Sequence, residues 1–488
     1  MSLRLYRIKL SKIYSNFEQF RTSIMESSSN HHSISDDYTE VYRRLAWTLQ
    51  IAYGVGHVLN DVCASMWFTY FLVFFQYVLQ FSKWQTGCLM FIGQVADALA
   101  TPFVGFHSDQ ADNFWLCRYG RRKIWHLLGT ICVLGAFPFI YSPCPGCSST
   151  SLWSSMFYYS VFIIIFQFGW ASVQISHLSL IPELTPNEHD RTKLTAVRYC
   201  FTVISNVLVY VVTWIVLHLH EGENSKISPK DGPKFQEIIW SVLCVGILCS
   251  AIFHIFVREG DSNSSNNVRG GQLRTSVAEL LSRFEVYQVA FVYMSSRLFV
   301  NLTQMFIPLY LHETLDMTAS SLAVVPLTIF VGSFATSLGI EKINRHCGRK
   351  ITYVIGTILG LAACIWINFG ENALYKKCFI YIVALLVGAG GSIILVTSLG
   401  VTTDLIGDRT DSGAFVFGIM SFTDKLANGI AVFLIEYLHN SPTYYREILT
   451  YVCGGSILVG AVAVISLCRG WNQRLSGYER IPDSSTIN

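Results

Sequence analysis

Residues 124–182 read IWHLLGTICVLGAFPFIYSPCPGCSSTSLWSSMFYYSVFIIIFQFGWASVQISHLSLIP and contain no Asp, Glu, Lys or Arg. A helix that crosses the hydrocarbon core of a bilayer needs about 20 apolar residues. The stretch is therefore long enough for two such helices, joined by the loop Ser142-Pro-Cys-Pro-Gly-Cys147. Because a backbone that faces lipid must satisfy its own hydrogen bonds, and the pattern is not one of short alternating strands, we expect α-helices here.

The whole chain has the composition of a membrane protein. Of its 488 residues, 52% are hydrophobic and only 14% are charged, whereas soluble proteins carry about 25% charged residues. Such a chain cannot cover a water-facing surface, so the lipid bilayer is its expected surrounding. The net charge of +3 is too small to indicate a nucleic-acid partner.

Further apolar segments continue the pattern along the chain. Six more runs lack charged residues, namely 199–220, 238–257, 317–340, 351–370, 378–403 and 448–468. Four segments are apolar but contain single charges, namely 45–78, 84–108, 285–313 and 412–438. Together with the first two, these segments predict an all-α membrane protein with twelve transmembrane helices in two six-helix bundles.

Basic residues mark one side of the predicted membrane. They gather in alternate loops, at Arg118, Arg121, Arg122, Lys123, Arg191, Lys193, Arg345, Arg349 and Lys350. Short cytosolic loops are enriched in Lys and Arg, so both termini are expected in the cytosol. The 1–44 tail lacks the pattern of a cleaved signal peptide. The predicted parts are a cytosolic tail at 1–44, six-helix bundles at 45–258 and 285–470, a cytosolic loop at 259–284 and a cytosolic tail at 471–488.

The two bundles repeat each other's loops. The second predicted helix (84–108) closes with Gly105-Phe-His-Ser-Asp109 and Arg118-Tyr-Gly-Arg-Arg-Lys123. The eighth (317–340) closes with Gly339-Ile-Glu341 and Arg345-His-Cys-Gly-Arg-Lys350. The fifth predicted helix (199–220) is preceded by Asp190-Arg-Thr192, and the eleventh (412–438) by Asp408-Arg-Thr410. Parallel duplication of a helix bundle is typical of transporters. We interpret the loop residues as gate contacts, namely Asp109, Arg118, Arg121 and Arg122.

Charged residues lie within the predicted membrane spans, at Asp61, Asp97, Arg198, Arg297, Asp424 and Lys425. A charge at the bilayer centre costs about 2.5–3.5 kcal/mol on insertion scales, so each one needs a function or a partner. Three acids and three bases suit a zwitterion, with a base holding its carboxylate and an acid its ammonium group. Pairs that neutralise one another would instead suit an uncharged solute such as a sugar.

Polar neighbours of these charges follow helical spacing, as His57 and Asp61 do. We predict a solute site made of Asp61, Asp97, Gln174, His177, Arg198, Arg297, Asn301 and Lys425. The candidates for proton coupling are Asp97, His57 and His177, since histidine titrates near neutral pH and burial raises the pKa of a carboxyl group.

No other chemistry is indicated. The sequence shows no metal motif, phosphate loop or Ser/His/Asp order, so we predict no metal site, no cofactor and no enzyme activity. Cys144 and Cys147 form a disulfide only if their loop faces an oxidising lumen, and the sequence leaves both states open.

Four motifs resemble those of the glycoside–pentoside–hexuronide cation symporters of the major facilitator superfamily. They are Tyr53-Gly-Val-Gly-His-Val-Leu-Asn-Asp61, Gln94-Val-Ala-Asp97, Arg118-Tyr-Gly-Arg-Arg-Lys123 and Leu180-Ile-Pro-Glu183. Longer runs resemble an animal branch of this superfamily that is associated with import of cysteine into lysosomes and related organelles. Examples are His57-Val-Leu-Asn-Asp-Val-Cys-Ala-Ser-Met-Trp-Phe-Thr-Tyr70 and Ser412-Gly-Ala-Phe-Val-Phe-Gly418. The resemblance implies the major facilitator fold and a transport function.

The resemblance also implies roles for single residues. The substrate-binding Asp of helix 1, the Arg of helix 5 and the Lys of helix 11 correspond to Asp61, Arg198 and Lys425. Of the two Asp residues in helix 2 that hold the symporters' cation, the first corresponds to Asp97 and the second to Thr101. A further Asp in helix 4 corresponds to Gln174, and the aromatic after it to His177. Two carboxylates are thus missing, which argues against sodium coupling and leaves proton coupling or facilitated exchange.

The expected function is alternating-access transport of a small zwitterion, cysteine by resemblance, across the membrane of lysosomes or related organelles. The expected partners are the solute and the lipid bilayer, and a monomer is expected. The tail motif Gly477-Tyr-Glu-Arg-Ile481 fits a tyrosine-based sorting signal, with Tyr478–Ile481 read by a sorting adaptor. The alternatives are a cation-coupled sugar symporter and a non-transporting receptor or scaffold with the same fold.

Overall fold

The computed structural model describes residues 46–109, 119–145, 152–185, 187–219, 226–259, 284–406 and 410–467. Several predictions concern residues outside these ranges. They are Arg118, Cys147, the tails 1–44 and 471–488, the Tyr478–Ile481 motif, the Asp109 side chain and nearly all of the 259–284 loop. All of the described ranges lie in one compact unit that begins at Leu45.

The predicted segments are helices in the described chain. The first half, here called the N-half, contains α2 (Trp47–Val55), α3 (Val58–Val73), the π-helix η1 (Phe74–Val78), α4 (Lys83–Asp109), α5 (Arg121–Ile140), α6 (Leu152–Ser179), α7 (Ile181–Leu184), α8 (Glu188–Leu219), η4 (Pro229–Asp231) and α9 (Gly232–Phe256). The second half, the C-half, contains α11 (Phe284–Leu309), η5 (Tyr310–Thr314), α12 (Ser321–Cys347), α13 (Arg349–Phe369), η6 (Tyr375–Phe379), α14 (Ile380–Ile406), α15 (Thr410–Tyr437), α16 (Tyr444–Glu447), η7 (Ile448–Val452) and α17 (Cys453–Ser466).

In the described part of the chain, eleven helices are long and apolar enough to cross a membrane. The remaining long helix is α11, whose 26 residues span about 39 Å at 1.5 Å per residue. It is less apolar because it carries Arg297, Asn301 and Gln304 on one face. The prediction of an all-α membrane protein is confirmed, and the polar face of α11 contributes to the site described below.

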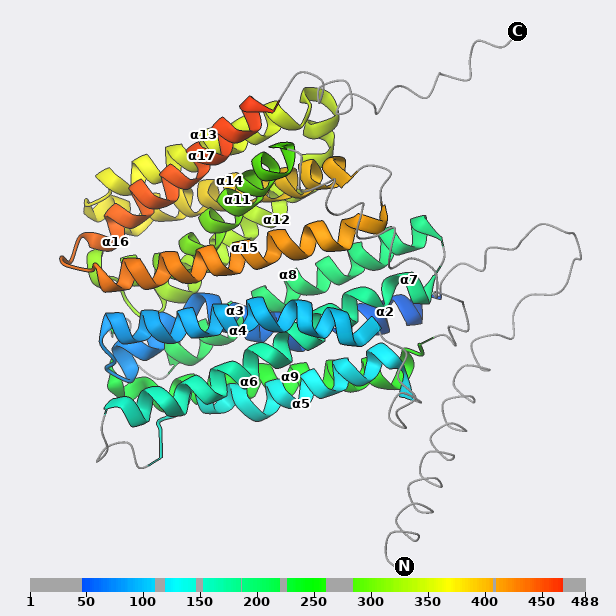
Figure 1. The fold of residues 1–488 in the computed structure, drawn as a ribbon. Helices are drawn as coiled ribbons and strands as arrows, with labels where there is room; N and C mark the ends of the chain where they lie inside the picture. Colours follow the sequence, from blue (N-terminus) through cyan, green and yellow to red (C-terminus); the bar gives the residue numbers. More distant parts are fainter. Residues whose placement is uncertain are drawn as a thin grey trace, which may run out of the picture. The chain divides into compact units, whose positions relative to one another are not determined.

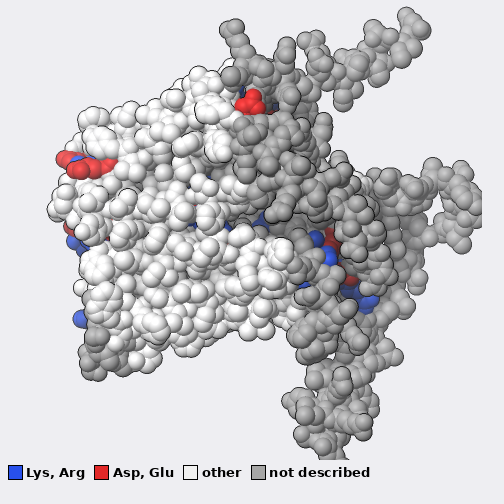
Figure 2. Space-filling model, in the orientation of Figure 1, with Lys and Arg blue, Asp and Glu red and all other residues white. Residues whose placement is uncertain are grey.

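The two halves lie side by side, with α2–α9 in the lower part of Figure 1 and α11–α17 in the upper part. Three helix pairs join them, because α3 packs against α11, α4 against α15 and α8 against α12. The flank that these helices present in Figure 2 is almost entirely uncharged, and most charged side chains lie at the two ends of the helices. An uncharged flank bounded by charged ends is what a bilayer requires.

The two ends of the bundle differ. We call the end with Arg121, Arg122, Arg349 and Lys350 the basic end. The opposite end lies on the left in Figure 1, and we call it the closed end. It is formed by η1, the start of α4, η5 and the segment from His439 to Tyr445.

The first membrane span of each half, which is α2 with α3 in the N-half and α11 in the C-half, ends with the same turn at the closed end. A π-helical turn closes α3 and α11, so that Leu79 N–H donates to the Phe74 carbonyl and Leu315 N–H to the Tyr310 carbonyl, both at 3.0 Å. The next residue has a positive φ in both halves, 59° at Gln80 and 57° at Asp316. This shared detail supports the internal duplication predicted from the loops.

Close packing of α13 on α14 depends on glycine. A Cβ at Gly390 would lie 2.7 Å from the Gly360 nitrogen and 2.9 Å from the Gly356 carbonyl oxygen, whereas a Cβ at Gly455 meets nothing within 4 Å. We expect Gly390→Ala to destabilise the protein by about 1–3 kcal/mol through overpacking. Gly455→Ala should be neutral or slightly stabilising, because alanine favours helix.

Thermal unfolding of the purified variants in detergent measures this difference. Equal melting temperatures for the two alanine variants would contradict the packing of α13 on α14.

Candidate functional site

A cavity of about 370 Å³ lies between the two halves. Its walls come from α3, α6 and α8 of the N-half and from α11, α12 and α14 of the C-half. Among the described residues that line it, the charged ones are Asp61 and Arg297, one from each half. Uncharged polar side chains complete the wall, including Ser65, Gln174, Thr202, Asn206, Asn301, Thr303, Gln304, Ser333 and Ser392.

Asp61 lies near the start of α3 and is held on both carboxylate oxygens. The Thr202 hydroxyl donates to Oδ2 at 2.8 Å, and His57 Nδ1 lies 2.9 Å from Oδ1. The prediction that His57 and Asp61 share one helix face is confirmed by this contact. Each carboxylate oxygen has a second lone-pair site, so Asp61 can accept one more donor from the cavity.

Arg198 contributes to the cavity indirectly. It does not line the wall, and its Nη2 lies 3.0 Å from His57 Nε2. A guanidinium group can only donate, so His57 Nε2 accepts and the imidazole proton sits on Nδ1, facing Asp61. Arg198 thus fixes the tautomer of His57, and His57 in turn orients the carboxylate of Asp61.

Arg297 is the basic group of the cavity. Its Nε donates to Asp424 Oδ2 at 3.0 Å, and its side chain is 34% exposed while that of Asp424 is 2% exposed. Asn428 also donates to Asp424, at 2.6 Å to Oδ1, so α15 holds this carboxylate firmly. A guanidinium group has five N–H donors. Arg297 therefore uses Nε for Asp424 and presents its other donors to the cavity.

The Asp97–Lys425 pair lies behind the cavity wall. Lys425 Nζ is 2.6 Å from Asp97 Oδ1 and 2.6 Å from the Thr101 hydroxyl, which joins α4 to α15. Neither charged residue lines the cavity, but the ammonium group lies 5.7 Å from the ring centre of Trp170, which does. The roles predicted for both in solute binding stay predictions, and the geometry gives them a clear role in joining the halves.

His177 is placed as a structural contact between α6 and α2. Its Nε2 donates to the Tyr53 carbonyl at 2.8 Å, and the Tyr53 hydroxyl donates back to the His177 carbonyl at 2.9 Å. The two rings stack with centroids 4.2 Å apart. Of the helix 4 residues predicted for the site, Gln174 lines the cavity and His177 does not.

The predicted gate residues contact their own half at the basic end. Arg121 Nη2 and Arg122 Nε lie 3.2 and 3.3 Å from Glu183 Oε1. The C-half has a comparable pair, with Arg349 Nη2 3.0 Å from Asp404 Oδ1. Arg121 and Arg122 therefore contact Glu183 within the N-half, and their role as a gate stays a prediction.

The remaining chemistry of the site is simple. Among the described residues, no group of three His, Cys, Asp or Glu side chains could hold a metal ion. Cys144 is disulfide-bonded. The sequence leaves open whether this cysteine is free or bonded, and the structure has the bonded state. The described cavity thus offers charges, hydrogen bonds and an aromatic wall for binding a solute.

Known proteins match this chain over most of its length. The family model described as MFS/sugar transport protein matches residues 52–451. The chain belongs to this family. It is 41% identical to human major facilitator superfamily domain-containing protein 12 over 469 residues, which cover 90% of this chain and 96% of the human protein. It is 21% identical to a mouse sphingosine-1-phosphate transporter over 87% of this chain and 88% of that protein.

Solved transporter structures share the fold. A D-xylose–proton symporter superposes with a TM-score of 0.65 at 16% identity, over 86% of this chain and 97% of the symporter. The nucleoside transporter NupG superposes with a TM-score of 0.63 at 12% identity, over 86% of this chain and 98% of NupG. The family match and the 41% identity to the human protein make this chain a transporter of the major facilitator superfamily, as the sequence motifs indicate.

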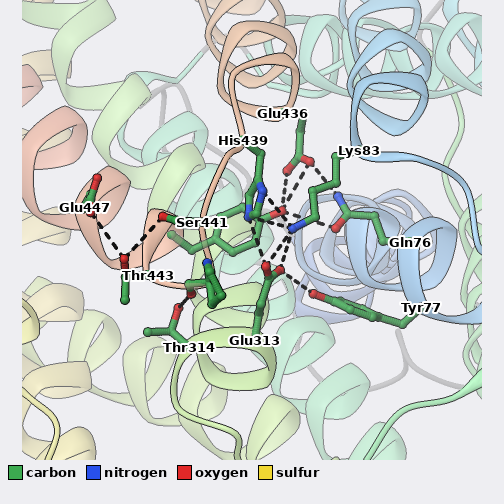
Figure 3. Close-up of polar contacts among 12 residues, drawn as sticks. Gln76, Tyr77, Lys83, Glu313, Thr314, Glu436, His439, Ser441, Thr443 and Glu447 are labelled. Atoms are coloured by element: carbon green, nitrogen blue, oxygen red, sulfur yellow. Dashed lines mark hydrogen bonds and ion pairs between the residues drawn. The ribbon is translucent and has the colours of Figure 1, made fainter.

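Four charged or titratable residues at the closed end are not among those predicted for the site, namely Lys83, Glu313, Glu436 and His439. They gather between the two halves (Figure 3). Each lies at the end of an apolar segment, where a charge resembles an ordinary loop residue. One feature of the sequence does point to these residues, because Lys83 is the only basic residue between the first two predicted helices.

Proposed function

We propose that the protein carries a small zwitterionic solute across a membrane by alternating access. The observation that supports this most is the pair of charges in the cavity. Asp61 of the N-half can hold an ammonium group, and Arg297 of the C-half can hold a carboxylate. A solute with both groups bridges the halves, so its binding favours their rearrangement around it.

Cysteine is the first candidate, because the sequence resembles a branch of the superfamily associated with cysteine import into lysosomes. The proposed location is the membrane of lysosomes or related organelles, with both termini in the cytosol. The arginines of the basic end support that orientation under the positive-inside rule. The closed end then faces the lumen of the organelle.

A sugar is the second candidate. The family's description includes sugar transport, and another relative, 22% identical over 39% of this chain, is an isoprimeverose transporter. Most polar groups of the cavity wall are amides and hydroxyls, which suit sugar hydroxyls. A sugar would bring no charged group to Asp61 or to the donors of Arg297 that Asp424 leaves free.

Binding of matched ligands separates the two candidates. Cysteamine lacks the carboxylate of cysteine, and 3-mercaptopropionate lacks its ammonium group. A charged hydrogen bond contributes about 1.5–3 kcal/mol, so each of these should bind about 10- to 100-fold more weakly than cysteine.

The measurement is the melting temperature of the purified full-length protein under reducing conditions. A ligand that binds the folded state raises it. We expect a rise with cysteine and none with cysteamine, 3-mercaptopropionate or xylose at the same concentration. A rise with xylose and none with cysteine would favour the sugar candidate.

A further inference from the structure

A polar cluster joins the two halves at the closed end (Figure 3). Phe68 of α3 lines the cavity. The cluster begins at Gln76 of η1, about 12 Å further along the same span at 1.5 Å per residue. We call it the closed-end cluster. Its members are Gln76, Tyr77 and Lys83 of the N-half and Glu313, Glu436, His439 and Tyr445 of the C-half.

Donors and acceptors are divided between the halves. Lys83 Nζ donates to both carboxylate oxygens of Glu313 at 2.8 Å, and the Tyr77 hydroxyl donates to Glu313 Oε2 at 3.0 Å. Gln76 Nε2 donates to Glu436 Oε2 at 2.8 Å. The N-half thus supplies donors that acid does not change, while the C-half supplies acceptors that acid can protonate.

His439 is an acceptor of the same kind. Lys83 Nζ lies 2.6 Å from its Nε2, and an ammonium group can only donate, so this nitrogen carries no proton. Glu313 Oε1 lies 3.1 Å from the same nitrogen. A proton on Nε2 would repel Lys83 and attract Glu313, so the imidazolium would take Glu313 from Lys83.

Glu436 has neutral donors only. Its side chain is 1% exposed, and it accepts from Gln76 and from the Tyr445 hydroxyl, the latter at 3.2 Å. Lys83 is bonded to Glu313 and His439 instead. The bond from Gln76 to Glu436 therefore joins the halves separately from the ion pair of Lys83. The Tyr445 hydroxyl also lies 3.3 Å from Gln76 Oε1, so its one proton is shared between Glu436 and Gln76.

Every packed element contributes titratable groups to this region. They are Tyr77 of η1, Lys83 of α4, His312 and Glu313 of η5, Glu436 of α15, His439, and Tyr444 and Tyr445 of α16. In this set, Glu313, Glu436, His312 and His439 can change charge between neutral and acidic pH. Of these, His312 has its Nε2 3.4 Å from the Ile227 carbonyl oxygen, outside the cluster.

We propose that protonation of His439 opens the closed end in acid. A proton on Nε2 turns this acceptor into a donor that repels Lys83 and draws Glu313 away from it, so the contacts of Lys83 with His439 and Glu313 between the halves are lost together. The inference rests on the proposed function in one respect, since that function makes the closed end face an acidic lumen. Luminal acid then favours release of the solute into the lumen.

The direction of the pH effect follows from linkage. Burial and the nearby Lys83 ammonium group lower the pKa of His439 in the closed state. In the open state, its pKa returns toward the ordinary value of about 6.5. The open state therefore binds the proton more tightly, and the closed state loses stability as the pH falls below about 6.5 toward the lowered pKa.

The test is a distance measurement across the closed end in the full-length protein in nanodiscs. Fluorophores are placed through noncanonical amino acids at two exposed positions, Lys230 of the N-half and Asn440 of the C-half. We expect energy transfer between them to fall as the pH is lowered from about 7.5 to about 4.5, across the histidine and carboxylate range. No solute is needed, so a wrong choice of solute leaves this test intact.

Variants assign the response to the cluster. His439→Gln removes the titrating imidazole and should reduce the pH response by at least half. His346→Gln, an exposed histidine at the basic end, should keep it. The proposal is overturned if the wild-type distance does not change with pH, if His439→Gln responds like the wild type, or if His346→Gln loses the response.

Discussion

Replacing Arg297 by glutamine is expected to lower cysteine uptake by at least about 100-fold. Arg297 offers the cavity a planar set of donors that matches a carboxylate, and two charged hydrogen bonds contribute about 3 kcal/mol or more together. That free energy corresponds to about a factor of 100. Initial rates of labelled cysteine uptake by proteoliposomes measure the effect.

The loss of Arg297 also leaves Asp424 buried without its cation, so stability needs its own control. A broken buried pair costs about 3–5 kcal/mol. The double variant Arg297→Gln/Asp424→Asn removes both charges and should regain most of the melting temperature while uptake stays low. Arg345→Gln changes an arginine whose side chain is 71% exposed and should transport normally. Normal uptake by Arg297→Gln would remove Arg297 from the solute site.

Lys425→Ala should strongly destabilise the protein. It leaves Asp97 fully buried beside Thr101, and an uncompensated buried charge costs about 3–5 kcal/mol. It also removes the bond between α4 and α15, so we expect uptake to be lost. Melting temperature and uptake of the same preparation report the two effects.

A paired change distinguishes a structural role from direct contact with the solute. In Asp97→Asn/Lys425→Gln, two amides replace the ion pair without leaving a charge, so most of the stability should return, and part of the uptake with it. Recovered stability without any uptake would mean that Lys425 handles the solute or a proton itself. A melting temperature for Lys425→Ala equal to that of the wild type would contradict the ion pair.

Local patterns in the sequence predict most of the fold and part of the cavity. The helices follow from apolar runs that need no knowledge of their neighbours. The faces that carry His57 with Asp61, and Arg297 with Asn301, follow from helical spacing alone. Each of these pairs of residues lies within one helical span, where the backbone fixes which side chains share a face.

Pairing between distant helices does not follow from such patterns. Asp97 and Lys425 are 328 residues apart, and their contact depends on how α4 packs on α15. The six intramembrane charges therefore suggest a common cavity, whereas packing sorts them into pairs and leaves Asp61 and Arg297 at the wall. The closed-end cluster escapes prediction for a related reason, because its charges lie at helix ends and acquire partners only when the halves meet.

The most direct test of the central claim is uptake of labelled cysteine into liposomes that contain the purified protein, under reducing conditions. We expect saturable uptake that unlabelled cysteine inhibits and that cysteamine, 3-mercaptopropionate and xylose do not. Uptake should be lost with Arg297→Gln/Asp424→Asn. Absence of cysteine uptake in liposomes that accumulate a labelled sugar would contradict a zwitterion site between Asp61 and Arg297.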